Sequence, residues 1–248
     1  MGPWRLEVLR AWRTRRLIAL AAAFLLFGLG DPILTYYLPE LVKSGSHGLK
    51  IPVPPQTPAD GIASYAGSVA QICTLVVVIV AAASLAIDAK PGLAAFYRTR
   101  LRRPASLILP RYLTITAAAI AAFALGTLGS WYETAVLLGH LSPAGLAAGF
   151  GLDTLWLCFA TAVTALFTSV VRSVAAAAGW SLACLLGLAA LGAVPALSSW
   201  LPTRLAGGVA DLIGQPAPAG LWHSILIAAL ACPVLVGLAV QRLGQREP

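Results

Sequence analysis

Two aspartates and two threonines inside long apolar stretches are the residues of this 248-residue chain best placed to do chemistry. Asp31 and Asp153 are costly there, because a charge at a helix centre costs about 2.5–3.5 kcal/mol on insertion scales. Thr154 and Thr161 lie on the same predicted helix as Asp153. These four residues would line a polar path or recognise a cationic substrate. The alternative, which we favour, is that they hydrogen-bond neighbouring helices, reach the outer interface or permit close packing.

Motifs for hydrolysis, metal binding or nucleotide binding do not occur. The three histidines, His47, His140 and His223, form no HExxH, and no paired aspartates or Ser–His arrangement accompanies them. The four cysteines form no CxxC, so we expect small core residues rather than a metal site. A G-x-x-x-x-G-K-[ST] loop is also missing. We therefore predict no catalytic residue, no metal and no cofactor bound by this chain.

Six apolar stretches must position any functional residue. Each is long enough to cross a hydrocarbon core of about 30 Å, and lipid-exposed backbone then requires helices. Composition agrees, with 59% hydrophobic and 10% charged residues, which excludes an ordinary soluble domain. We predict an all-α, polytopic membrane protein, with residues 1–248 forming a single transmembrane domain. The predicted spans are 17–38, 63–87, 112–131, 146–171, 174–194 and 221–240.

The basic residues predict the orientation of these spans. Of 17 Lys and Arg residues, all but Lys43, Lys50 and Arg204 lie in the N-terminal segment, the C-terminal tail or every second gap between spans. Because Lys and Arg near helix ends stay in the cytoplasm, both termini should be cytoplasmic. The net charge of +8 is then explained by topology and anionic headgroups, not by nucleic acid. We expect a multi-pass protein of a bacterial plasma membrane.

Residues 1–16 predict an amphipathic helix lying in the inner membrane interface. Trp4 and Trp12 recur on one face at helical spacing, while Arg13 and Arg16 lie on the other. The alternative is a disordered basic leader that only sets topology.

The longest predicted cytoplasmic loop, residues 88–111, also has helical character. Pro91 suits a first helical turn, Leu93, Phe96 and Tyr97 follow at helical spacing, and Pro104 ends the pattern. The expected product is a short basic helix whose aromatic face would suit docking onto a partner protein.

Two predicted outer segments differ in character. Residues 38–60 contain five prolines and predict an extended loop. Residues 195–220 are moderately apolar, and within them residues 201–213 predict a short helix too brief to cross the membrane. We favour a re-entrant segment over an ordinary surface loop with an interfacial Trp.

Taken together, the interfacial helix, six-helix core, cytoplasmic helix and outer segment resemble the ABC-2 type permeases of ABC transporters. The local match is Asp88, Gly92, Pro104 and Arg111, similar to the acidic residue, glycine, proline and basic residue that the family has before its third helix. The resemblance implies the ABC-2 fold of type V exporters.

It also implies a transmembrane subunit whose cytoplasmic helix fits a separate ATPase. A pair of these ATPase subunits would bind ATP and Mg²⁺. A second permease subunit, the same chain or a similar one, would complete the assembly. The substrate would be an amphipathic drug, lipid or peptide. A six-helix substrate-binding subunit, a channel and a membrane scaffold remain alternatives. The residues implied to couple to the ATPase are Asp88, Gly92, Leu93, Phe96, Tyr97, Arg98, Arg100 and Arg103.

Overall fold

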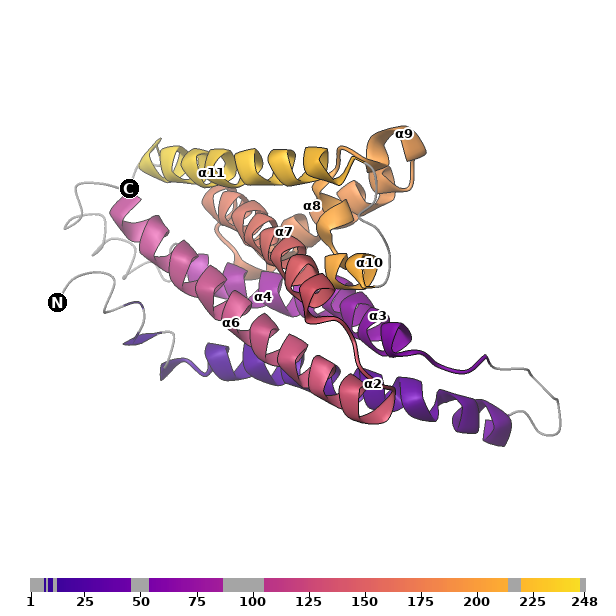
Figure 1. The fold of residues 1–248 in the computed structure, drawn as a ribbon. Coiled ribbons are helices and arrows are strands. Elements are labelled where there is room, and N and C mark those ends of the chain that lie inside the picture. The colour runs from indigo at the N-terminus through magenta and orange to yellow at the C-terminus, as the bar shows by residue number, and fades with distance from the viewer. Residues whose placement is uncertain are drawn as a thin grey trace.

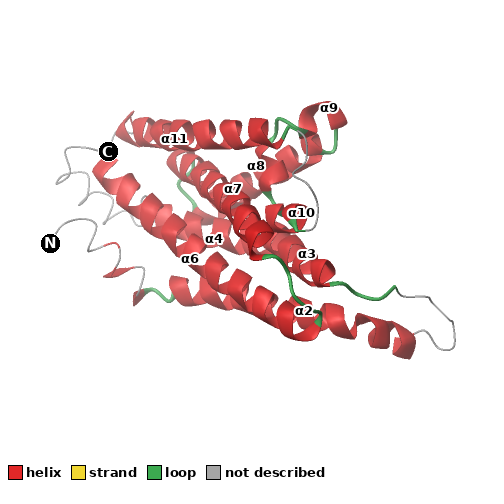
Figure 2. Cartoon of the chain, in the orientation of Figure 1, coloured by secondary structure: helices red, strands yellow, loops and turns green. Residues whose placement is uncertain are grey.

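A computed structural model describes residues 7, 9–10, 13–45, 54–86, 105–213 and 220–245, apart from the side chains of residues 106 and 107. Within these ranges every regular element is helical (Figure 2). Six helical segments are long and apolar enough to cross a membrane. The predicted all-α class is confirmed, and the described residues contain six candidate spans, the number predicted.

The six spans run along the chain as follows. The first is α2 (Arg16–Gly45). The second is a continuous helical segment made of α3 (Pro58–Ser68), the π-helical η1 (Val69–Cys73) and α4 (Thr74–Leu85). The remaining four are α6 (Ala105–Leu137), α7 (Pro143–Val170), α8 (Val174–Gly192) and α11 (Leu221–Gln245).

Helix α7 lies at the centre of this arrangement (Figure 1). It contacts α4, α6, α8 and α11. In the most apolar 18-residue stretch of α7, 61% of the residues are buried, against 22% in the corresponding stretches of α2, α8 and α11. A polar residue on α7 therefore faces protein more often than lipid.

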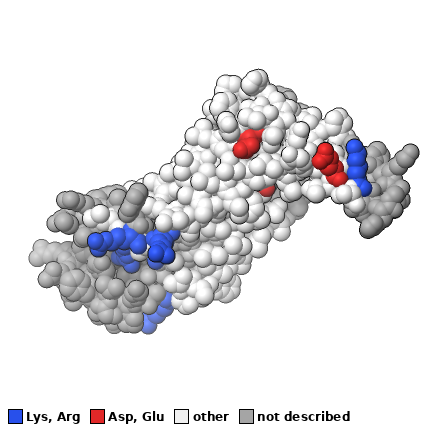
Figure 3. All heavy atoms as spheres, turned by 90° about the horizontal axis from the view of Figure 1, so that it is seen from below, with Lys and Arg blue, Asp and Glu red and all other residues white. Residues whose placement is uncertain are grey.

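One end of the bundle is basic. Helices α2, α6 and α8 begin there, and α4, α7 and α11 end there (Figure 1). Figure 3 shows most of the visible Lys and Arg side chains gathered at one end, with a smaller basic patch beside acidic side chains at the other. We call this the basic end and the other the opposite end. The described arginines of the basic end are Arg10, Arg13, Arg15, Arg16, Arg111, Arg172 and Arg242.

Glycines bring α2 and α6 into backbone contact. A Cβ built on Gly126 would lie 2.6 Å from the Phe24 carbonyl oxygen, and one built on Gly28 would collide with the backbone of Gly126. Small residues at a crossing allow this approach, which is how helices associate without a hydrophobic driving force between them.

An aromatic cluster fills the core next to that crossing. The Phe123 ring stacks on Phe150 of α7 at a centroid distance of 4.9 Å and an interplanar angle of 2°. It also lies 5.8 Å from the ring of Phe24 and 6.4 Å from that of Tyr65. The Phe123 side chain of α6 is fully buried and therefore packs against aromatic residues of α2, α3 and α7.

The proline-rich segment 38–60 differs from its prediction as an extended loop. Helix α2 continues through Pro32 and Pro39 to Gly45, and α3 begins at Pro58. Proline removes one hydrogen bond, which neighbouring helices and polar groups can compensate in a membrane helix. Pro58 instead suits a first helical turn, where Thr57 N–H donates to Asp60 Oδ2 at 2.8 Å.

Candidate functional site

The segment between α8 and α11 is fastened to α7 by a buried carboxylate. We call its described part, residues 195–213, the outer segment; it contains α9 (Pro195–Ser198), the 3₁₀-helix η2 (Pro202–Leu205) and α10 (Gly208–Leu212). The Asp153 carboxylate accepts the Gly207 N–H at 2.7 Å and the Val209 N–H at 2.9 Å. Only 1% of Asp153 is exposed, so both bonds form away from water, where they are strongest.

Glycines let the outer segment approach α7 closely. Gly145, Gly149 and Asp153 recur at intervals of four and so lie on one face of α7. A Cβ on Gly145 would lie 2.8 Å from the Leu212 carbonyl oxygen, and one on Gly208 would lie 2.5 Å from Leu152 Cβ. The backbones of α7 and α10 are therefore in contact.

The outer segment is not the single short helix predicted over residues 201–213. Gly207 has φ +88°, a left-handed conformation that glycine adopts without steric cost. The chain turns there between η2 and α10, and this turn presents the two amides to Asp153. Asp153 therefore makes structural hydrogen bonds of the kind that we favoured from the sequence, and its place in a polar path stays a prediction.

Thr161 joins α7 to α6 within the bundle. Its hydroxyl lies 3.0 Å from the Thr116 hydroxyl and donates to carbonyls of its own helix, including Leu157 O at 2.9 Å. One turn away, the Tyr112 hydroxyl donates to Cys158 O at 3.2 Å. The two contacts form a buried polar seam between the helices.

A second interior contact includes the π-turn of the second span. Thr74 Oγ1 donates to Val69 O, five residues back, at 2.9 Å, and accepts the Trp156 indole N–H at 3.1 Å. Thr74 and Trp156 are each 4% exposed. π-Turns inside α-helices occur often at functional sites. This one lies where the second span meets α7.

Replacing Thr74 with Val is expected to lower the free energy of unfolding by about 1–3 kcal/mol, because the buried indole N–H of Trp156 loses its acceptor. Trp156→Phe removes the donor instead. The double variant should lose less stability than the two single variants lose together. A double-mutant cycle of thermal unfolding in detergent measures this difference. Strict additivity would contradict the coupling.

Asp31 lies on α2 with one carboxylate oxygen buried. The residue is 9% exposed, and its Oδ2 makes no hydrogen bond with the described residues, although the Ser68 hydroxyl lies near the carboxylate. Its backbone carbonyl accepts the Thr35 hydroxyl at 2.8 Å. A buried carboxylate oxygen without a hydrogen bond is the feature expected of a residue that recognises a cation. Asp31 therefore remains a candidate residue of the substrate path.

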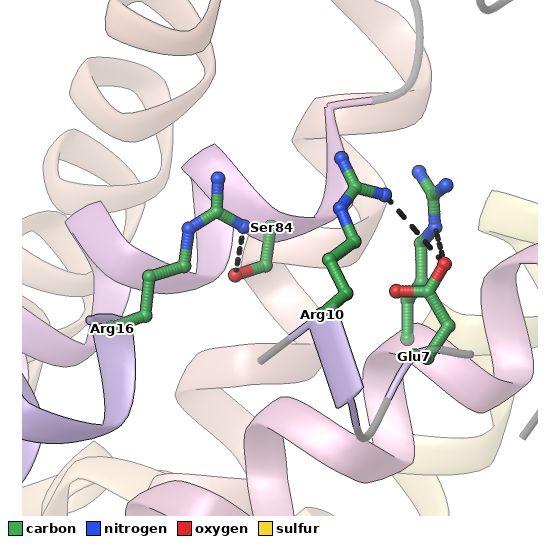
Figure 4. A network of polar contacts seen from close by, with 5 residues as sticks. Glu7, Arg10, Arg16 and Ser84 are labelled. Atoms are coloured by element: carbon green, nitrogen blue, oxygen red, sulfur yellow. Dashed lines mark hydrogen bonds and ion pairs between the residues drawn. The ribbon is translucent and has the colours of Figure 1, made fainter. Parts of the chain in front are cut away.

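A polar network ties the N-terminal segment to the basic end (Figure 4). Glu7 lies 2.9 Å from Arg111 Nε and 3.6 Å from Arg10. Arg16 donates to Ser84 Oγ at 2.9 Å. Arg111, predicted at the end of a loop, is instead inside α6 and only 4% exposed, because α6 begins at Ala105.

The remaining predicted residues divide into two groups. Arg13 and Arg16 are described, and Arg13 is exposed. Thr154 is next to Asp153, and its hydroxyl has no hydrogen-bond partner among the described residues. Among the described residues, the side-chain hydrogen bonds of Asp153 and Thr161 go to different neighbours, Asp153 to the outer segment and Thr161 to α6. The residues outside the described ranges are Trp4, Trp12, Asp88, Gly92, Leu93, Phe96, Tyr97, Arg98, Arg100 and Arg103.

Sequence reasoning missed Glu7, Thr74, Ser84 and Trp156. Glu7 is the sole acidic residue among the first 30, a signal that was available. Among the described residues no group of three His, Cys, Asp or Glu side chains could hold a metal ion.

The apolar helices and charge distribution define a polytopic membrane-spanning protein. No family model matches the chain. It is 29% identical over 210 residues to a curated protein of Bacillus subtilis (strain 168) named uncharacterized transmembrane protein YxlG, a match that covers 80% of this chain and 79% of that protein. The similarity agrees with a membrane-spanning chain.

Proposed function

We propose that the chain is the permease subunit of an ABC-2 type exporter in the plasma membrane. The observation that carries the proposal is the outer segment, which lies between α8 and α11 and is fastened against α7 by Asp153. In ABC-2 exporters, segments at this position are expected to dip into the outer leaflet and close the pathway.

The charge distribution supports the orientation that an exporter would need. The basic end carries seven described arginines, and Lys and Arg are retained on the cytoplasmic side. Both termini would then be cytoplasmic, the predicted coupling region within residues 88–111 would face the same compartment, and the outer segment would face outward.

The proposed mechanism divides the work between chains. A pair of ATPase subunits binds ATP and Mg²⁺, and their closure is transmitted through the predicted cytoplasmic helix from Leu93 to Arg103. Two permease subunits, identical or similar, would open a path between them for an amphipathic substrate such as a drug, lipid or peptide.

Changing both Phe96 and Tyr97 to Ala is expected to abolish ATP-driven transport while the protein remains inserted, because the aromatic docking face is lost. The control changes Tyr36 and Tyr37, an adjacent and exposed aromatic pair near the opposite end, to Ala.

The measurement is affinity purification from the native host with assays of bound ATPase, ATP hydrolysis and dye or lipid efflux. An ATPase with a phosphate-binding loop should co-purify with the wild type and the Tyr36/Tyr37 variant but not with the Phe96/Tyr97 variant. Purification of intact wild-type protein without any ATPase would refute the proposal and favour a channel or scaffold.

A further inference from the structure

The basic end contains an open pocket between the N-terminal segment, α2, α4 and α6. It is shallow: its water-accessible interior is about 20 Å³, so a bound group larger than water would extend into the open mouth. Most of the lining residues are polar or charged, although much of the wall that they expose is the apolar part of their side chains. The lining residues are Glu7, Arg10, Arg16, Ser84, Arg111, Thr114 and Ile115.

The charge of this pocket is strongly positive. Three guanidinium groups, of Arg10, Arg16 and Arg111, face one carboxylate, that of Glu7, so the formal charge of the wall is +2. Arginines concentrated in a partly buried site attract anions, because a low local dielectric strengthens the interaction.

The geometry already shows an oxyanion in place. The Glu7 carboxylate lies 2.9 Å from Arg111 Nε and 3.6 Å from Arg10. Glu7 therefore serves as a hydrogen-bond acceptor for some of the N–H groups of these two arginines. Arg16 faces the same pocket from α2, and among the described residues its guanidinium donates to a neutral partner, Ser84 Oγ. Figure 4 shows Arg16 in contact with Ser84 and Arg10 in contact with Glu7.

We propose that this pocket binds a phosphate group, with Arg10 and Arg16 as its principal ligands and Ser84 and Thr114 as neutral hydrogen-bonding groups. Arginine forms paired hydrogen bonds with phosphate oxygens, and a phosphodiester of charge −1 or a phosphate of charge −2 would offset the +2 wall. The pocket lies where the spans begin and end, the depth of lipid headgroups, so the phosphate would come from an anionic phospholipid or from a soluble phosphate compound.

The test uses the full chain purified in a neutral detergent, with short-chain phosphatidylglycerol and inorganic phosphate as separate probes. Binding is followed by native mass spectrometry for the lipid and by the shift in unfolding temperature for both probes. Changing Arg10 and Arg16 together to Gln is expected to weaken binding about tenfold or more, as the loss of a charge-assisted hydrogen bond does. The matched control is Arg13→Gln, which removes an exposed arginine of the same segment that does not line the pocket.

Preferential loss of phosphatidylglycerol binding in the double variant, with Arg13→Gln close to wild type, would support a lipid headgroup site. The same pattern with inorganic phosphate, at equal or higher affinity, would support the pocket and assign it to a soluble phosphate compound. Failure of the wild type to bind either probe would overturn the proposal, as would equal weakening in Arg13→Gln and the double variant. An Arg10→Lys, Arg16→Lys variant keeps the charge and serves as a folded reference should the glutamine variant unfold.

Discussion

Replacing Asp153 with Ala is expected to free the outer segment from α7 and to lower the free energy of unfolding by about 3 kcal/mol or more. The reason is that the Gly207 and Val209 amides lose a shared, charged acceptor at a site from which water is excluded. Asp153→Asn should be less damaging, because its amide oxygen can still accept one of the two bonds.

Thermal unfolding and amide hydrogen exchange of residues 207–209 measure this effect. Asp211→Ala is the matched control, since Asp211 is an exposed carboxylate on the same short helix α10. Normal exchange protection of Gly207 and Val209 in Asp153→Ala would show that the glycine contacts with α7 alone hold the segment. Transport assays on the same variants would then report whether the fastened segment is needed for function.

The second large effect is expected at the crossing of α2 and α6. Gly126→Ala places a Cβ 2.6 Å from the Phe24 carbonyl oxygen, so the helices must separate, and the expected cost is about 1–3 kcal/mol. Gly28→Ala should behave similarly, because its new methyl group would meet the Gly126 backbone.

Gly30→Ala provides the control on the same helix, since a Cβ there meets nothing within 4 Å. It should leave stability unchanged or raise it slightly, because alanine favours the helical state more than glycine does. Equal unfolding temperatures for Gly126→Ala and Gly30→Ala would contradict the close crossing.

The spans and the basic end were predictable because they depend on local composition. Apolar length identifies a membrane helix, and the arginines cluster between alternate spans whatever the tertiary contacts. The ends of the spans were less predictable. Pro39 indicated a stop that α2 does not make, because a proline in a membrane helix costs one hydrogen bond rather than the helix.

The candidate site was less predictable because its contacts join residues far apart in the chain. Asp153 meets Gly207 across 54 positions, and Trp156 meets Thr74 across 82. Neither pairing has a periodic signal. Gly145 and Gly149 were an available signal of a close approach to the face that carries Asp153, and our predictions did not include it.

The π-turn at Val69–Cys73 determines which side of the second span can face the bundle. Core residues in this span recur at intervals of four, at positions 65, 69, 73, 77, 81 and 85, and all are at most 5% exposed. In a regular α-helix each interval overshoots a full turn by about 40°, so the last would face nearly away from the first. The extra residue in the π-turn reverses about 100° of that drift. Deleting one residue there would restore a regular helix but rotate its two halves out of phase, turning either Tyr65 or Val77 toward lipid.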